Sequence, residues 1–198
     1  MNPSRNYCLP VLIVALALTA LIYWPGLAGS FTFDDTGFVT GNSAIQVSSL
    51  HLADWVNAAM SFPANHQGRW LTMLSFAANH YFTGMNPYWY KLTNLVIHLL
   101  NGVLLYLALR ALFHFHQKSR SDSNPSFNGG LAAATLAALW LVLPINLTGV
   151  LYVSQRLESL SNTFVFLGLA WYLRARLALW QEQGKGTGLW LALITCTG

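Results

Sequence analysis

Charged residues are scarce in this sequence of 198 residues: Lys, Arg, Asp and Glu together make up 8% of it, against roughly 25% in an ordinary soluble domain. Cysteine is almost absent, and the only two, Cys8 and Cys196, exclude a disulfide framework or a thiolate metal site. The basic residues are scattered, so the net charge of +4 does not indicate nucleic-acid binding. Hydrophobic residues make up 55% of the chain, which is typical of an integral membrane protein.

The apolar residues gather into stretches of the length that crosses a bilayer as a helix, about 20 residues. We expect four full spans, at about 9–28, 88–113, 129–147 and 157–180, and a truncated fifth that starts at 189. The first could instead be a cleaved signal peptide, because Arg5 precedes it and small residues end it. The predicted fold is all-α, a polytopic transmembrane helix bundle over residues 1–198, and the chain looks like the N-terminal part of a longer protein.

A long mixed segment, residues 29–87, separates the first two spans. Within it, apolar residues recur at helical spacing from Trp70 to Tyr81, which predicts a helix lying on the membrane surface. Most Lys and Arg residues fall on the side of the amino terminus, so this terminus is expected in the cytoplasm and residues 29–87 outside. Four of the six acidic residues then also lie outside, namely Asp34, Asp35, Asp54 and Glu158. Charges are few on this side, and each is therefore a candidate for function.

The most unusual local feature is the pair Asp34-Asp35, where the chain leaves the first span. Adjacent carboxylates at a membrane surface are costly unless water, a metal or a cation compensates them. The pair could form a turn or a helix cap, but its aromatic surroundings favour a general base or a metal ligand. We expect Asp35, one residue further from the span, to reach a substrate more freely and to be the ligand of any divalent cation (Mg²⁺ or Mn²⁺).

Polar residues also form a stripe on the second span. Lys91, Asn94, His98 and Asn101 recur at steps of three or four and so share one helical face. Such a stripe faces the bundle interior or a watery cavity, where it either joins helices by hydrogen bonds or serves a site. Lys91, near the outer end, is the best placed of the four to meet an anionic group.

Two arginines are expected near the outer surface. Arg156 precedes the fourth span, and Arg69 precedes the predicted surface helix. Each guanidinium could contact a phosphate in bidentate fashion, or could simply reach the interface, for Arg156 with Glu158 as a partner. Together with the carboxylates on the same side, these cations indicate a phosphorylated lipid substrate.

The ordered motifs of the chain resemble those of membrane-embedded GT-C glycosyltransferases. More narrowly, they are similar to the bacterial polytopic proteins of this class that often carry tetratricopeptide repeats after the membrane part. The matching pieces are, in order, Phe33-Asp34-Asp35, Gly68-Arg69-Trp70-Leu71, Gly84-Met85-Asn86-Pro87-Tyr88, Asn94-Leu95-Val96-Ile97-His98 and Tyr152-Val153-Ser154-Gln155-Arg156-Leu157.

This resemblance implies a GT-C-like bundle in the bacterial inner membrane. It would transfer a sugar from a polyprenyl-phosphate donor to a protein or glycan acceptor, with inversion at the sugar carbon. One residue of the pair Asp34-Asp35 would be the base or a metal-linked carboxylate, Arg156 would lie near the donor phosphate, and Arg69 would shape the site. The alternatives are a transporter or lipid-carrier-binding protein, in which polar residues continue to mid-membrane depth, and an inactive homologue.

Overall fold

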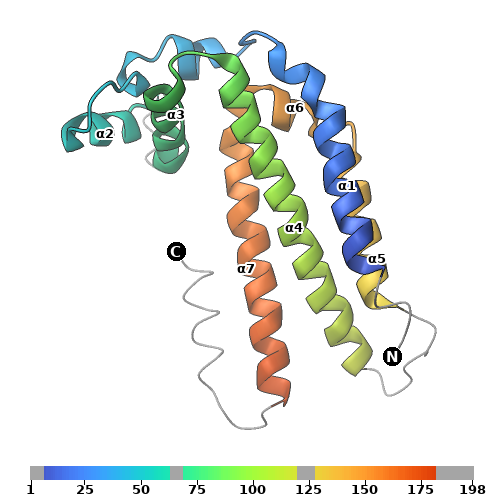
Figure 1. Ribbon diagram of the computed structural model, residues 1–198. Helices are drawn as coiled ribbons and strands as arrows, with labels where there is room; N and C mark the ends of the chain where they lie inside the picture. The colour runs from blue at the N-terminus through green and yellow to red at the C-terminus, as the bar shows by residue number, and fades with distance from the viewer. Residues whose placement is uncertain (1–6, 63–68, 120–127, 182–198) are drawn as a thin grey trace. The chain divides into compact units, whose positions relative to one another are not determined.

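The computed structural model describes residues 7–62, 69–119 and 128–181, and the regular structure in these ranges is entirely helical (Figure 1). The expectation of an all-α chain is therefore confirmed for the described residues. The stretch from 189 onward, expected to begin a fifth span, lies outside them.

Two helices are long and apolar enough to cross a membrane, and both fall where the sequence predicts spans. The first is α1 (Cys8–Tyr23), which continues as a 3₁₀ segment, η2 (Trp24–Ala28), where Pro25 interrupts the α-helical hydrogen bonds. The second is α4 (Pro87–Ser119), which begins with proline at a position where no backbone N–H is needed. The Asn86 side chain caps it by accepting a hydrogen bond from the Tyr88 backbone N–H (3.1 Å).

The other two predicted spans take a different form. Helix α5 (Gly129–Val142) has 14 residues, or about 21 Å, and ends five residues before the expected boundary at 147. Leu143 is extended because it precedes Pro144, and the short helix α6 (Asn146–Leu151) follows. Helix α7 (Arg156–Gln181) is long, but charged residues near both ends make it less apolar than α1 and α4. Four full spans are therefore not established.

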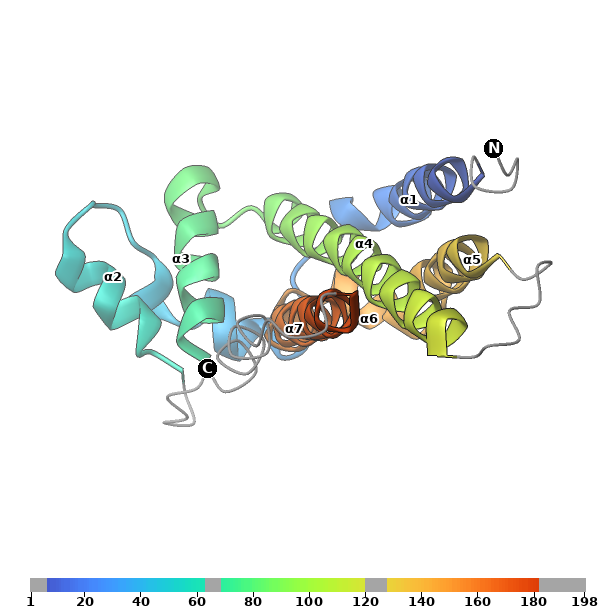
Figure 2. The same cartoon turned by 90° about the horizontal axis from the view of Figure 1, so that it is seen from below.

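The segment 29–87 is more ordered than a loop. It contains a π-helical turn, η3 (Thr36–Thr40), a 3₁₀ turn, η4 (Ser43–Ile45), and the helices α2 (Leu52–Ala59) and α3 (Trp70–Thr83). Helix α3 coincides with the predicted surface helix, although its location on a membrane stays a prediction. Gly84 ends α3 with φ +63°, a conformation that side chains disfavour. Helices α2 and α3 pack against each other (Figure 2).

The chain divides into two compact units, each built from separate stretches. The first, called the bundle unit, comprises Met1–Thr19, Leu99–Leu143 and Ser161–Gly198. Its described core includes Cys8, Leu12 and Tyr106 and three alanines of α5. Gly102 lets α4 approach α5 closely, because a Cβ there would lie 2.5 Å from the Leu141 side chain. Small residues at such contacts are typical of membrane helix packing.

The second, called the loop unit, comprises Ala20–His98 and Pro144–Leu160. Its core brings the residues around Asp34-Asp35 together with α3, the start of α4 and the start of α7. The buried members include Val39, Ile45, Met73, Phe76, Tyr90, Val153 and Leu157. This unit also contains most of the residues for which the sequence predicts a functional role.

Candidate functional site

Asp34 and Asp35 have opposite environments in the loop unit. Asp34 is exposed, and its carboxylate makes no hydrogen bond or ion pair with the described residues. Asp35 has no exposed surface; its Oδ2 accepts from the Thr32 N–H (3.0 Å) and its Oδ1 from the Ser154 N–H (2.7 Å). The expectation that Asp35 has the greater freedom to reach a substrate is therefore wrong for this structure. Its carboxylate instead joins two distant parts of the chain.

The residue before the pair explains why the two carboxylates diverge. Phe33 has φ +48°, the left-handed conformation, which costs an ordinary side chain about 1–2 kcal/mol. The turn that it makes sends Asp35 into the core and leaves Asp34 outside. The Phe33 ring, itself exposed, lies against Tyr152 with ring centroids 5.5 Å apart. Strain of this kind persists where the surrounding structure fixes it, and it is frequent at functional sites.

Lys91 is a nearly buried cation beside this turn, 4% exposed. Its charge interacts with that of Asp35, but among the described residues its ammonium makes no hydrogen bond and no ion pair within 4 Å. Gly29 provides the space for it, since a Cβ at that position would lie 2.9 Å from Lys91 Nζ. Lys91 is thus a cation with unused hydrogen-bonding capacity.

Arg156, expected to contact a lipid phosphate, is instead completely buried and bound to protein groups. Its Nε donates to Asn94 Oδ1 (2.7 Å) and its Nη2 to the Tyr90 carbonyl (2.8 Å). Its Nη1 donates to Asn79 Oδ1 (2.7 Å) and to the carbonyl and hydroxyl oxygens of Ser75 (3.1 Å each). The guanidinium also lies over the Phe76 ring, 4.7 Å from its centroid.

This environment joins three elements at one cation. Ser75 and Asn79 come from α3, Tyr90 and Asn94 from α4, and Arg156 from the start of α7. Complete burial lowers the pKa of Arg156 to about 9, an effect that Tyr90 partly opposes, so the guanidinium stays charged at neutral pH. In this structure no part of it is accessible to a phosphate. Ser75, Asn79 and Tyr90 are functional partners that the sequence does not reveal. The spacing of four between Ser75 and Asn79 in α3 is a weak signal, and Tyr90 of α4 gives none.

The polar stripe of α4 is buried, as expected. Asn94 has no exposed surface, and its amide nitrogen also donates to the Tyr152 carbonyl (3.0 Å). His98 lies edge-on to Tyr23, with ring centroids 5.7 Å apart. Asn101, also buried, belongs to the bundle unit. Asn94 therefore links α4 by hydrogen bonds to the segment around Tyr152 and Arg156, and a role of the stripe in a site stays a prediction.

Arg69 and Glu158 form an exposed ion pair, with 3.9 Å between Nη2 and Oε1. The Arg69 guanidinium also lies over Phe62, 4.9 Å from the ring centroid. Glu158 therefore pairs with Arg69 and not with Arg156. Such a pair contributes little to stability at a surface, and it leaves Arg69 accessible.

The donor set does not suit a metal site built by the described residues. They contain no group of three or more His, Cys, Asp or Glu side chains that could hold an ion. Both oxygens of Asp35 already accept backbone hydrogen bonds, so Asp34 is the one free carboxylate of the pair. Because Mg²⁺ and similar ions need several oxygen ligands, we derive no step through a metal.

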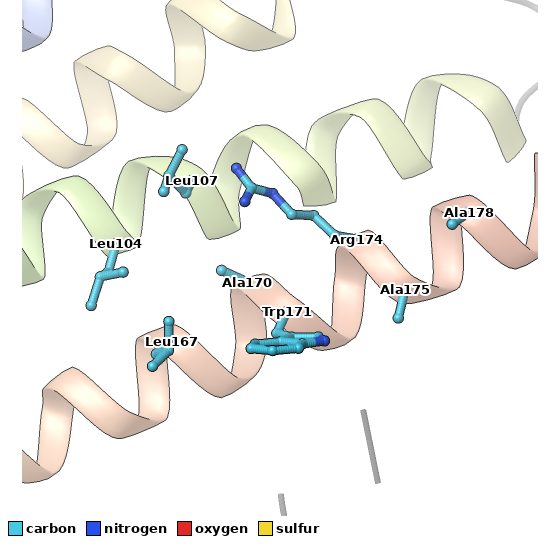
Figure 3. Close-up of a pocket in the computed structure, with 8 residues that line it drawn as sticks. All are labelled: Leu104, Leu107, Leu167, Ala170, Trp171, Arg174, Ala175 and Ala178. Carbon is cyan, nitrogen blue, oxygen red and sulfur yellow. The ribbon is translucent and has the colours of Figure 1, made fainter. Parts of the chain in front are cut away.

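A separate cavity lies in the bundle unit, between α4 and α7 (Figure 3). Its lining is apolar apart from one arginine, and none of the residues predicted for a site belongs to it. The lining residues are Leu104, Leu107, Leu167, Ala170, Trp171, Arg174, Ala175 and Ala178.

No protein-family model and no solved structure matches the chain. Among curated proteins, human protein O-mannosyl-transferase TMTC1 is 27% identical over 164 residues, which are 79% of this chain and 17% of that protein. Human protein O-mannosyl-transferase TMTC3 is 27% identical over 176 residues, 86% of this chain and 18% of that protein. Human protein O-mannosyl-transferase TMTC4 is 26% identical over 176 residues, 86% of this chain and 24% of that protein. The chain thus spans less than a quarter of the length of these relatives.

Proposed function

We propose that this chain forms part of a membrane glycosyltransferase that transfers a sugar from a polyprenyl-phosphate-linked donor to a hydroxyl group of a protein or glycan acceptor. Similarity to proteins named O-mannosyl-transferases supports the reaction class, and it favours mannose as the sugar. The observation that carries the proposal is the pair of unlike aspartates. One carboxylate is fixed in the core and holds the turn, while the other stands free at the surface.

Asp34 is the catalytic base in this reaction. It accepts the proton of the acceptor hydroxyl while the hydroxyl oxygen forms a bond to the anomeric carbon of the sugar. The bond from that carbon to the phosphate oxygen breaks, and polyprenyl phosphate leaves with the bonding electrons. A base must be accessible and held in place to be efficient. Exposure of Asp34 meets the first condition. The hydrogen bonds that Asp35 accepts from the Thr32 and Ser154 N–H groups support the second, because they hold the turn in place.

Lys91 binds the phosphate of the donor. It is a nearly buried cation that makes no hydrogen bond or ion pair with the described residues, and it lies near the Asp34-Asp35 turn. An ammonium is suited to a phosphate as a point charge. We therefore assign contact with the donor phosphate, which the sequence predicts for Arg156, to Lys91. Arg156 is instead a positioning residue for the segment that holds Asp35. Arg69 remains accessible at the surface and helps to shape the entrance.

We place the proposed reaction at the outer face of a bacterial inner membrane. Support comes from the uneven distribution of Lys and Arg, which puts the amino terminus in the cytoplasm and Asp34 outside. The transporter alternative receives less support, because a path across the bilayer needs polar residues along its whole length. On α4, no charged or amide side chain follows Asn101 until Arg110.

The test is donor consumption by the full-length protein in proteoliposomes. Polyprenyl-phosphate mannose is supplied, and released polyprenyl phosphate is measured with an acceptor present. The Asp34→Asn variant should lose at least 100-fold in rate, the usual range for removal of a general base, while its melting temperature stays unchanged. The Lys91→Gln variant should mainly raise the KM for the donor.

Asp54→Asn is the matched control. Asp54 is an exposed aspartate of α2 that accepts a hydrogen bond from Ser49, and its removal should leave the rate unchanged. Full activity of the Asp34→Asn variant, or an equal loss in the Asp54→Asn variant, would contradict the assignment of Asp34 as the base.

A further inference from the structure

The cavity of the bundle unit has a lining that suits a hydrocarbon chain. Leu104 and Leu107 of α4 face Leu167 of α7 across it (Figure 3). The volume is about 420 Å³. The α7 side of the cavity stays open because several of its side chains are small, namely those of Ala170, Ala175 and Ala178. The apolar part of such a groove accommodates part of an acyl chain.

The lining of the cavity also carries a positive charge. Arg174 extends from α7 toward α4 beside Leu107 (Figure 3). It is exposed and forms no ion pair with the described residues. Arg110 of α4 and Arg176 of α7 are also exposed, and the described residues of the bundle unit include no Asp or Glu. Among the described residues of this unit the charge is therefore uncompensated, and it favours an anionic partner.

The aromatic residue next to Arg174 on α7 is of a type that membrane interfaces favour. Trp171, one turn before Arg174, is exposed, and Trp is enriched where the hydrocarbon core of a bilayer meets the headgroups. An arginine beside an exposed Trp therefore suits the headgroup region of a lipid.

We propose that the cavity between α4 and α7 binds an anionic phospholipid. Its headgroup phosphate contacts the Arg174 guanidinium, and part of one acyl chain lies along Leu104, Leu107 and Leu167. The charge beside an apolar groove selects a lipid that is both anionic and long-chained. This site is independent of the proposed sugar transfer and requires no catalysis.

The experiment is native mass spectrometry of the full-length protein in detergent, titrated with phosphatidylglycerol or with phosphatidylcholine of the same acyl chains. Wild type should bind phosphatidylglycerol more tightly. Arg174→Gln should lower this affinity about fivefold, the effect of one basic residue near a membrane surface, and should lower phosphatidylcholine binding less, because the choline cation offsets the phosphate charge. Arg176→Gln is the matched control, because it removes the same charge from a residue that does not line the cavity, and it should have little effect.

A second variant tests the cavity itself. Ala175→Leu keeps all the arginines but narrows the groove, and it should weaken the binding of both lipids. Equal binding of the two lipids by wild type would overturn the proposal, as would equal losses in Arg174→Gln and Arg176→Gln. Unchanged lipid binding by Ala175→Leu would also overturn the proposal, because the lipid would then bind outside the groove. The groove would have another occupant, such as a segment of the chain outside the described residues. The melting temperature of each variant identifies any that has lost its fold.

Discussion

Replacing Arg156 with alanine should destabilise the loop unit more than the substitution of any exposed residue does. The side chain has no exposed surface, and its departure leaves Asn94 Oδ1 without its donor and removes a donor from the Tyr90 carbonyl. A buried acceptor without its donor costs roughly 1–3 kcal/mol. Ser75 and Asn79 are only half-buried, so water can replace their lost hydrogen bonds. The expected loss is therefore about 3 kcal/mol.

The assay is thermal unfolding of the full-length protein in mild detergent, followed by intrinsic fluorescence. Arg156→Ala should melt several degrees lower than wild type. Arg156→Lys should fall between the two, because an ammonium keeps the charge but cannot donate in the five directions of a guanidinium. A double variant, Arg156→Leu with Asn94→Leu, should recover part of the loss, since it removes donor and acceptor together.

The same variants separate a positioning role from phosphate binding. If Arg156 only holds the segment that carries Ser154, Arg156→Lys should change the melting temperature and kcat while the KM for the donor stays near that of wild type. An unchanged melting temperature combined with a strongly raised KM for the donor would refute this reasoning. It would support direct contact between Arg156 and the donor phosphate.

Three further substitutions, one of them with a matched control, test other parts of the loop unit. Asp35→Asn should lower the melting temperature, because its NH₂ group would face one of two backbone N–H groups and lose a hydrogen bond worth about 1–3 kcal/mol; an unaltered melting curve would contradict this. Gly84→Ala should also destabilise, by about 1–3 kcal/mol, because φ is +63° there, whereas Gly37→Ala, with open space around its Cβ, should be neutral in the same melting experiment. Gly29→Ala should displace the ammonium of Lys91 and raise the KM for the donor in the transfer assay, and donor kinetics equal to those of wild type would count against the phosphate role of Lys91.

Much of the fold follows from local properties of the sequence. Runs of apolar residues place α1 and α4, and helical spacing places α3. Helix boundaries also have local causes, such as Pro87 at the start of α4 and Pro144 after α5. The apolar run alone extends the third span to 147, but the proline restricts Leu143 to an extended conformation and ends the helix earlier.

The candidate site was predictable only as a set of residues. The scarcity of charge in the sequence makes Asp34, Asp35, Lys91 and Arg156 conspicuous, and the structure places all four in the loop unit. Their roles could not be assigned, because the partners of Arg156 come from residues between 62 and 81 positions away, and Asp35 meets Ser154 across 119 positions. No local pattern reports contacts at that separation.

The sequence by itself determined that this chain is helical, that it is apolar enough for a membrane, and which few charged residues are candidates for chemistry. These properties depend on composition and on spacing along the chain. Only the tertiary structure decided which charges are free. It buried Asp35 and Arg156 among hydrogen-bonding partners and left Asp34 exposed, because the energy of a charge depends on the groups that fold around it.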